Sequence, residues 1–302
     1  ADTVRDLRDS LREHPGRIAA GGVGVVWGTA ALLVVLAWGS GFRAYVRAEM
    51  GRYGRPSIEV LPGVTSSGFP PTRPGVPVRF ARGDVAAIER DNPALVEAAL
   101  PQHFSASRVE VEAAGRVRRL DLTGTDERFP FYRSFRIGTG RYFDRGEVRA
   151  ARAVAVLGFD AAAELFGDPA AAVGRSIRVE GRSFVVIGVA AKKGRQYVNT
   201  ARADNRLLLV PLTTAETRLG FADELARFSV FPRPGVDPAA ALAAVRRTLG
   251  LRCGFDPRDV DALRTYDLTR ALRASDLFHA GFVFFLGTAG ATTLAIGGLA
   301  IA

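Results

Sequence analysis

Cysteine and histidine are scarce in this chain of 302 residues. The single cysteine, Cys253, excludes a disulfide framework and any zinc site built on cysteines. The three histidines, His14, His103 and His279, are too far apart in the sequence to indicate a metal cluster. No Ser-His-Asp, Cys-His or paired-carboxylate pattern stands out. We therefore predict no catalytic, cofactor-binding or metal-binding residues, and we expect that the chain is not an enzyme.

Lysine is also scarce, because only Lys192 and Lys193 are lysine among 41 basic residues. The formal net charge of +10 would suit a nucleic-acid partner. However, the arginines are spread along the whole chain, whereas a nucleic-acid footprint forms a patch or stripe. The bias toward arginine, alanine and glycine is typical of a GC-rich genome, and we predict no nucleic-acid partner. The basic turn at 192–195 fits either a solvated loop or a contact with lipid head groups or a partner.

The nucleotide-binding motifs are missing as well. No GxxxxGK sequence followed by Ser or Thr occurs, so the chain cannot hydrolyse ATP by the P-loop route. The glycines of 22–28 imitate a dinucleotide-binding loop, but no strand precedes them and no acidic residue follows about 20 residues later. We therefore expect any ATP and Mg²⁺ to be bound by another subunit or segment.

Two runs, residues 18–42 and 277–302, contain no Asp, Glu, Lys or Arg. A helix needs about 20 apolar residues to cross a bilayer, and a charge at its centre costs about 2.5–3.5 kcal/mol. Both runs are therefore predicted to be transmembrane helices. The alternatives are a cleaved signal peptide for the first run and a buried core helix for the second. Arginines are equally frequent on both sides of the first run, so they do not give its orientation.

Small residues in these runs are candidates for helix packing. Gly24 and Gly28 form a GxxxG pattern, and Gly297 and Gly298 give the second run a similar surface. Such glycines let helices approach closely, although they also occur facing lipid. Before the first run, residues 1–17 are predicted to form an amphipathic helix in the membrane interface, with an ordinary solvated helix as the alternative.

Residues 43–276 are predicted to form a folded α/β domain between the two apolar runs. Alternating and buried apolar patterns predict strands, and polar or glycine residues mark the helix ends. Asp84 and Asp237 are predicted helix N-caps, and Thr213 with Glu216 is predicted to form a capping box. The predicted strands are 57–61, 107–113, 116–123, 153–157, 176–179, 183–189, 207–210 and 225–231. The predicted helices begin near 84, 159, 213 and 238, the second being 159–166 and the last ending at Gly250.

The order of elements near the start resembles the order near the end. A strand–helix–strand unit occurs at each end, and a different α/β segment lies between them. This arrangement predicts one split subdomain with an insertion. Beyond residue 255, the pattern predicts a strand and then a helix that leads into the second apolar run.

Several motifs resemble the periplasmic core domain of MacB-type, FtsX-like ABC transporter permeases. The longest is RAVAVLGFDAAAELFGDPAAAVGRSIRVEGRSFVVIGVAAKKG at 152–194. Others are GTGRYFD at 138–144, LLLVPLTTAETRLG at 207–220 and the pair Gly297–Gly298. The N-terminal LRDSLREHPGRIAAGGVGVVWG is similar to the interfacial helix and first span of that family. The resemblance covers nearly the whole chain.

The resemblance implies a multi-pass permease of the bacterial inner membrane with a cytoplasmic N-terminus. The central domain would lie outside the cytoplasm, with residues 56–125 and 224–262 forming a porter-like part and 126–223 an inserted α/β part. Helices at 43–55 and 263–275 would form stalks. The permease would dimerise, as a homodimer or heterodimer, and relay motion from a partner ABC ATPase to a substrate or a periplasmic adaptor. No residue selects among export, lipoprotein extraction and regulation of cell-wall hydrolases.

The family has four spans, and two of them are not in this sequence. Because the chain starts with Ala and stops inside its second apolar run, we expect it to be part of a longer protein. The alternative function is a two-span membrane sensor, in which the central domain binds a ligand and signals to a cytoplasmic module.

Overall fold

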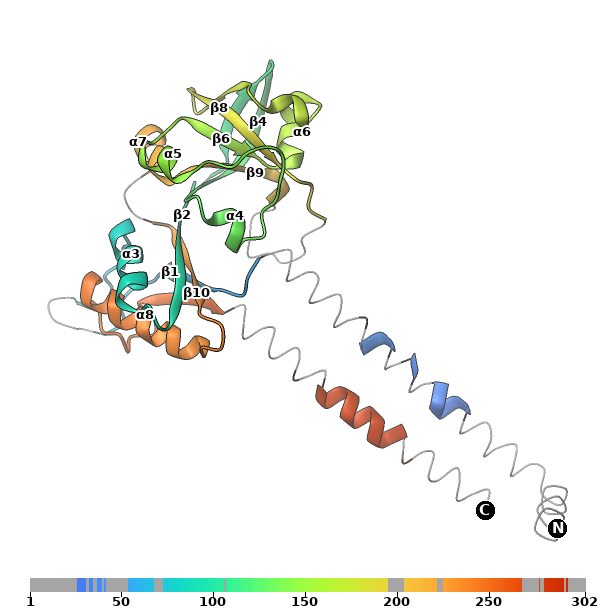
Figure 1. The fold of residues 1–302 in the computed structure, drawn as a ribbon. Helices are drawn as coiled ribbons and strands as arrows, with labels where there is room; N and C mark the ends of the chain where they lie inside the picture. Colours follow the sequence, from blue (N-terminus) through green and yellow to red (C-terminus); the bar gives the residue numbers. More distant parts are fainter. Residues whose placement is uncertain are drawn as a thin grey trace, which may run out of the picture. The chain divides into compact units, whose positions relative to one another are not determined.

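The chain divides into two units, Met50–Thr269 and the terminal segments Ala1–Glu49 with Arg270–Ala302. The computed structural model describes residues 26–30, 33–34, 37–39, 41, 54–67, 73–105, 107–194, 204–221, 225–267, 277, 280–290 and 292. The first of these units is an α/β domain of two lobes, and it is called the core domain below (Figure 1).

The first lobe is an antiparallel sheet in the strand order β11, β1, β10, β2. Its elements are β1 (Ile58–Pro62), α3 (Arg82–Asp91), β2 (Val96–Phe104), β10 (Arg227–Pro232), α8 (Pro238–Cys253) and β11 (Leu263–Asp267). Helices α3 and α8 lie side by side and supply Val85, Ile88, Val245 and Leu249 to the core of this sheet. Ile58 pairs with Asp267, so the chain enters and leaves the core domain at the same end of two neighbouring strands.

The second lobe is a closed ring of six strands. The pairings run β4–β3, β3–β7, β7–β8, β8–β6, β6–β9 and β9–β4. The ring strands are β3 (Val109–Ala113), β4 (Arg116–Thr125), β6 (Val154–Leu157), β7 (Ser176–Val179), β8 (Arg182–Ala190) and β9 (Leu207–Pro211). Closure removes free strand edges, and side chains such as Val111, Leu157 and Phe184 fill the interior with α6 (Phe159–Phe166) packed against them.

A third apolar cluster, the inter-lobe core, joins the two lobes. The short helix α4 (Phe129–Tyr132) contributes Phe129 and Tyr132 to it. They pack with Phe231 of the first lobe and Leu209 of the second. The remaining short elements are β5 (Ile137–Gly140), α5 (Arg145–Arg149), the 3₁₀ turns Ala170–Ala172 and Asp204–Arg206, and α7 (Leu212–Leu219).

The structure differs from the predicted domain boundary at the hairpin of β3 and β4. The predicted porter-like part includes residues 56–125. In the structure this hairpin belongs to the ring, because β3 pairs with β7 and β4 pairs with β9. Strand β2 was not predicted, since Pro101 in its middle argues against a strand. It forms because both of its faces are buried, and Pro101 pairs with Phe228 of β10.

Two of the predicted helix starts are wrong in detail. Helix α3 has Ala81 at its N-cap, and Asp84 lies at the third helical position, where its carboxylate accepts a hydrogen bond from the Ala81 N–H at 2.9 Å. In α7 the Thr213 hydroxyl donates to the carbonyl of Val148 instead of capping its own helix. Glu216 pairs with Arg82 and His103 instead, so groups elsewhere in the fold, one backbone carbonyl and two side chains, take both residues of the predicted capping box.

The last helix also ends later than predicted. Helix α8 continues through Gly250 to Cys253, and Gly254 ends it in the left-handed conformation, with a φ of 75°. Gly250 has a packing role instead, because a Cβ there would lie 2.7 Å from the carbonyl oxygen of Phe255. Asp237 caps this helix as predicted, accepting a hydrogen bond from the Ala239 N–H. Helix α6 has the predicted bounds.

The terminal segments are described only in part. Residues 26–30 and 280–290 are helical, and large apolar side chains there are exposed, with Trp27 at 76% and Phe284 at 73%. In the stretches that the structure describes, no helix is both long and apolar enough to cross a membrane. Much of the two predicted spans lies outside the described residues, as do residues 1–17. The predicted stalk helix 263–275 is wrong at its start, because Leu263–Asp267 form strand β11 and pair with β1, and its remainder lies outside the described residues. Of the other predicted stalk helix, 43–55, the structure describes residues 54 and 55, which are not helical.

Gly158 holds the start of α6 close to the backbone of residues 204 and 205. A Cβ at this position would overlap the main chain of Asn205, although the φ of −64° suits any residue. We expect Gly158→Ala to destabilise the core domain by about 1–3 kcal/mol. The added methyl group would meet the backbone of Asp204 and Asn205, which cannot move aside as a flexible side chain could. Thermal or denaturant unfolding measures this difference. Gly83→Ala is the matched control, since its nearest atom would be 3.6 Å away, and equal unfolding of both variants would contradict the prediction.

Candidate functional site

The first candidate site is the point where the chain enters the core domain. Gly54 has a φ of 116° and lies so close to the carbonyl of Tyr132 that no side chain would fit there. The next residue, Arg55, donates its backbone N–H to the same carbonyl at 2.8 Å. The start of the domain is therefore fixed to α4, at the edge of the inter-lobe core.

The side chain of Arg55 strengthens this attachment. Its Nη1 and Nη2 atoms donate to both carboxylate oxygens of Glu97 in β2 at 2.5 and 2.7 Å. Its guanidinium also lies 5.4 Å from the ring centre of Phe131 and 5.2 Å from that of Tyr132. The hydrogen bonds from Arg55 lower the pKa of the Glu97 carboxyl and so stabilise its charged form. We call this group of residues, Gly54, Arg55, Glu97, Phe131 and Tyr132, the Arg55 clamp.

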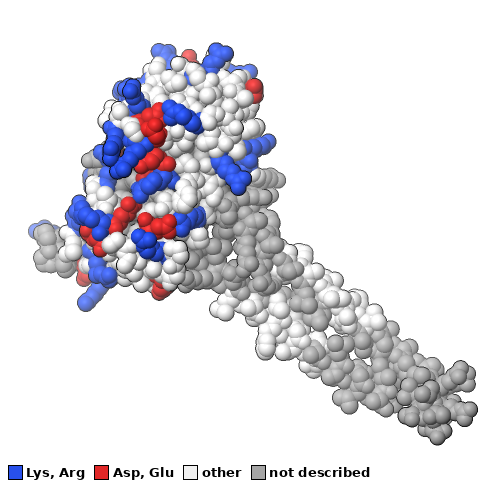
Figure 2. Space-filling view, in the orientation of Figure 1, with Lys and Arg blue, Asp and Glu red and all other residues white. Residues whose placement is uncertain are grey.

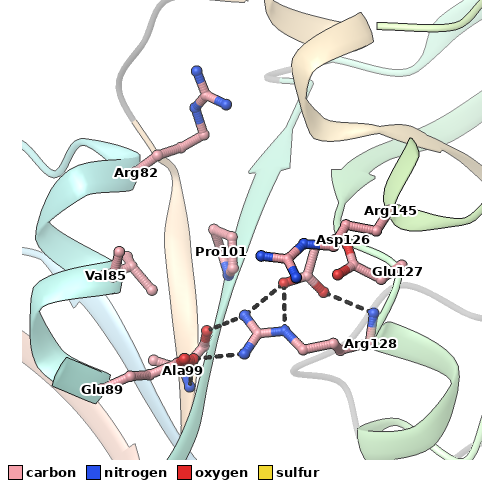
Figure 3. Close-up of a pocket in the computed structure, with 10 residues that line it drawn as sticks. Arg82, Val85, Glu89, Ala99, Pro101, Asp126, Glu127, Arg128 and Arg145 are labelled. Carbon is pink, nitrogen blue, oxygen red and sulfur yellow. Dashed lines mark hydrogen bonds and ion pairs between the residues drawn. The ribbon is translucent and has the colours of Figure 1, made fainter. Parts of the chain in front are cut away.

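The second candidate site is a cleft of about 370 Å³ between the lobes (Figure 3). Residues of α3 and β2 line one side, and residues after β4 and in α5 line the other. Three arginines and three carboxylates face it. The lining residues are Arg82, Val85, Ala86, Glu89, Ala99, Pro101, Asp126, Glu127, Arg128 and Arg145.

Arg128 is the centre of the hydrogen-bond network in this cleft. Its guanidinium donates to Asp126 Oδ2 at 2.7 and 2.9 Å, to Glu89 Oε1 at 2.7 Å and to the Ala99 carbonyl at 3.0 Å (Figure 3). Burial alone would lower the pKa of Arg128, but Asp126 and Glu89 outweigh it and raise that pKa. The pKa of Asp126 is raised, mainly by its burial. Because Glu89 belongs to α3, this network connects the two lobes.

A second ion pair crosses between the lobes nearby. Arg82 Nε of α3 lies 3.1 Å from Glu216 Oε1 of α7. The same carboxylate oxygen lies 3.2 Å from Nε2 of His103, which is 3% exposed. Figure 2 shows acidic and basic side chains interleaved down the side of the core domain that carries α5, α7 and α3. The cleft thus lies in a surface of paired charges and not in a patch of one sign.

The family model that describes a MacB-like periplasmic core domain matches residues 23–248. The chain belongs to this family. It is 27% identical over 282 residues to a pyoverdine export ATP-binding/permease protein of Pseudomonas syringae pv. tomato, covering 92% of this chain and 40% of that protein. It is 30% identical over 219 residues to a macrolide export ATP-binding/permease protein of Chlorobium luteolum, covering 72% of this chain and 32% of that protein.

Solved structures show the same fold. The periplasmic region of MacB from Actinobacillus actinomycetemcomitans matches with a TM-score of 0.57 at 16% identity, over 77% of this chain and 95% of that chain. The extracellular domain of the transporter YknZ from Gram-positive bacteria matches with a TM-score of 0.56 at 16% identity, over 70% and 100%. The resemblance that the sequence motifs indicated is confirmed. The chain spans less than half the length of the curated relatives that it matches.

The predicted packing glycines are only partly described. Gly28 lies in the helical residues 26–30 and is half-buried. Gly24, Gly297 and Gly298 lie outside the described residues. In the described part of the chain, no three His, Cys, Asp or Glu side chains gather as metal ligands would. The sequence analysis did not identify the Arg55 clamp or the cleft, because their partners are far apart in the sequence.

The basic turn is not simply exposed, as either prediction for it assumed. Lys193 lies 2.5 Å from Asp204, and the two side chains are only 13% and 2% exposed. Burial lowers the pKa of the Lys193 ammonium. The amide of Asn205 holds the Lys193 backbone at both its N–H and its carbonyl. This pair therefore joins the chain just after β8 to the 3₁₀ turn Asp204–Arg206, and Arg195 lies outside the described residues.

The Arg55 clamp predicts a pH-dependent stability. Because the folded-state pKa of Glu97 is lowered, the pair stabilises the domain above the unfolded pKa of about 4.3, and this stabilisation is lost as the pH falls through the lower, folded pKa. We expect Arg55→Ala to lower the melting temperature at pH 7, with a difference from the unaltered chain that shrinks on acidification below pH ~4. Thermal unfolding followed by circular dichroism measures it. Arg118→Ala removes a looser 3.7 Å pair and is the control. A pH-independent loss for Arg55→Ala would contradict the prediction.

Proposed function

We propose that this chain is the permease part of a MacB-type ABC transporter in the bacterial inner membrane. In this proposal, transmembrane helices flank an extracytoplasmic core domain, and an ABC ATPase, on a separate subunit or on another part of the same protein, binds ATP and Mg²⁺. The permease works as a dimer. It relays the motion of the ATPase to the core domain, which acts on a substrate, an adaptor or an envelope protein.

The pairing of β1 with β11 carries this proposal. The chain enters the core domain just before Ile58 and leaves it just after Asp267, and these residues are opposite each other in the sheet. Both connections to the charge-free runs therefore start from one end of the first lobe. If the two flanking helices moved relative to each other, they would pull on β1 and β11. These two strands are joined by a ladder of backbone hydrogen bonds.

The Arg55 clamp supports the relay. A displacement of the chain before Gly54 would act on β2 through Glu97 and on α4 through Tyr132. Since α4 packs in the inter-lobe core, the displacement would reach both lobes. Bidentate arginine–carboxylate pairs hold direction as well as distance, which suits a connection that has to transmit force.

The names of the relatives favour the transporter over the sensor. The proteins from Pseudomonas syringae and Chlorobium luteolum are both named as export ATP-binding/permease proteins. The names give different cargoes, pyoverdine and macrolides, although the two relatives are about equally similar to this chain. We therefore propose export, or a related mechanical action on the envelope, without a specific cargo.

The topology of the proposal is tested by thiol labelling. Burial raises the pKa of Cys253 to about 12, so this thiol is a poor target at neutral pH. We therefore use Cys253→Ser with Arg182→Cys, at the exposed first residue of β8. A membrane-impermeant maleimide should label this protein in spheroplasts, whereas Ser10→Cys in the same background should react only after lysis. Labelling of residue 10 alone in spheroplasts would overturn the proposed orientation.

The coupling is tested by purifying the full-length protein from native membranes. We expect a P-loop ATPase to be present, on the same polypeptide or as a co-purifying subunit. We also expect ATP hydrolysis to fall to background when its P-loop lysine is replaced by alanine. Mass spectrometry and a phosphate-release assay measure both. Recovery of a kinase or receptor module without an ATPase would overturn the transporter and favour the two-span sensor.

A further inference from the structure

Helix α3 presents two opposite charges to the second lobe on one face. Arg82 and Glu89 are seven residues apart, a spacing that puts them on the same side of a helix. Arg82 pairs with Glu216 of α7 at 3.1 Å, and Glu89 pairs with Arg128 at 2.7 Å. Each partner has the opposite charge. If α3 were turned end to end, Arg82 would face Arg128 and Glu89 would face Glu216, so the charges fit in one orientation of the helix.

The cleft lies along this face of α3. Val85 and Ala86, which lie between Arg82 and Glu89 in the sequence, line it together with Pro101 (Figure 3). Along this wall the lobes are separated by a cavity of about 370 Å³ and bridged by charged side chains, two of which, Arg82 and Arg128, are 47% and 35% exposed. Ion pairs with this much exposure stabilise a fold only weakly, because water screens their charges.

Strand β2 passes from one lobe to the other beside the cleft. Its residues through Gln102 pair with β10, and His103 and Phe104 pair with β4. Pro101 lies at this change of partner and has no N–H to donate to either ladder. The backbone ladder of β2 therefore lacks one donor beside the point where the lobes meet, and a bend there has one hydrogen bond fewer to disturb.

We propose that α3 is a two-point electrostatic latch that holds the lobes closed over the cleft. When both ion pairs are released, the lobes open about the middle of β2 while the inter-lobe core keeps them attached. The parts of the core domain that move are thus the two lobes, relative to each other. This inference rests on the proposed function only for what drives the motion, since the latch itself is a property of the core domain.

The test measures the distance between the lobes in the full-length protein. Spin labels are placed at Leu251→Cys in α8 and at Arg182→Cys, the first residue of β8, both exposed, in the Cys253→Ser background. The latch variant is Arg82→Gln with Glu89→Gln, which removes one charge of each sign. The matched control is Arg90→Gln with Asp91→Asn, which removes a 2.9 Å ion pair from the same helix, with both partners exposed.

We expect pulsed electron paramagnetic resonance to show one narrow distance distribution in the unaltered and control proteins. The latch variant should add a second population at a different distance. If the latch variant and the control give the same distribution as the unaltered protein, the latch is overturned. Should the latch variant fail to fold, Arg82→Glu with Glu89→Gln replaces it. This variant must change the distribution, and the further change Glu216→Arg, which restores one ion pair with its charges exchanged, must reverse the change.

A reversible cross-link separates this inference from the proposed function. Arg82→Cys with Glu216→Cys in the Cys253→Ser background can be joined by a short bis-methanethiosulfonate, which forms a disulfide with each cysteine, and released by a thiol reductant; the side chains that these cysteines replace meet at 3.1 Å. If the proposed function is right and the latch must open, cross-linking should abolish the ATP-dependent change in the inter-lobe distance, and reduction should restore it. A distance change that survives the cross-link overturns the latch. If ATP changes no distance in the open form while the latch variant does, the proposed relay fails and the latch stands.

Discussion

The antiparallel pairing of β1 with β11 constrains the rest of the core domain. Because Ile58 is opposite Asp267, the chain between them has to return to where it started, and any segment that leaves the first lobe has to come back to it. Strand β2 carries the chain out, and α7 followed by β10 brings it back. The second lobe is therefore an insertion between β2 and β10, and it forms a core and a sheet of its own. Six of its strands pair into a ring, so each has a neighbouring strand on both sides within the lobe. Strand β2 joins this ring at β4 through His103 and Phe104.

The two kinds of contact between the lobes differ greatly in strength. The inter-lobe core contains three phenylalanines that are at most 2% exposed, Phe129, Phe143 and Phe231. Truncating a buried phenylalanine to alanine typically costs about 3–5 kcal/mol. A half-exposed ion pair contributes about 1 kcal/mol or less. Any motion between the lobes would therefore break the charged contacts around α3 first and leave the aromatic contacts around α4 in place.

Local patterns in the sequence predicted much of the fold, and the failures have physical causes. Helix α6 has its predicted bounds because glycines lie at both of its ends and its buried residues follow helical spacing. Strand β2 was missed because Pro101 is a poor strand residue by itself, and only burial between two lobes overrides that preference. The hairpin of β3 and β4 was predicted as a hairpin but assigned to the wrong lobe. Pairing with β7 and β9 decides its place, and those strands lie far along the chain.

The candidate sites were harder to predict than the elements that carry them. Glu216 follows Thr213 at capping-box spacing, yet its carboxylate lies between Arg82 and His103, which are more than 100 residues earlier in the chain. A local rule cannot anticipate such a competitor. The same limit applies to Arg55 and Glu97, whose side chains meet 42 residues apart in sequence.

The scarcity of lysine acquires a structural meaning in this fold. Arg128 holds the carboxylates of Asp126 and Glu89 and the carbonyl of Ala99 at once. A planar guanidinium offers five donors in a fixed fork, whereas an ammonium is a single point charge. Arg55 uses the same fork on both oxygens of Glu97 and stacks its plane near two aromatic rings. At these two places arginine is required by geometry and not only by codon usage, so a lysine there would keep the charge and lose the connection between the elements.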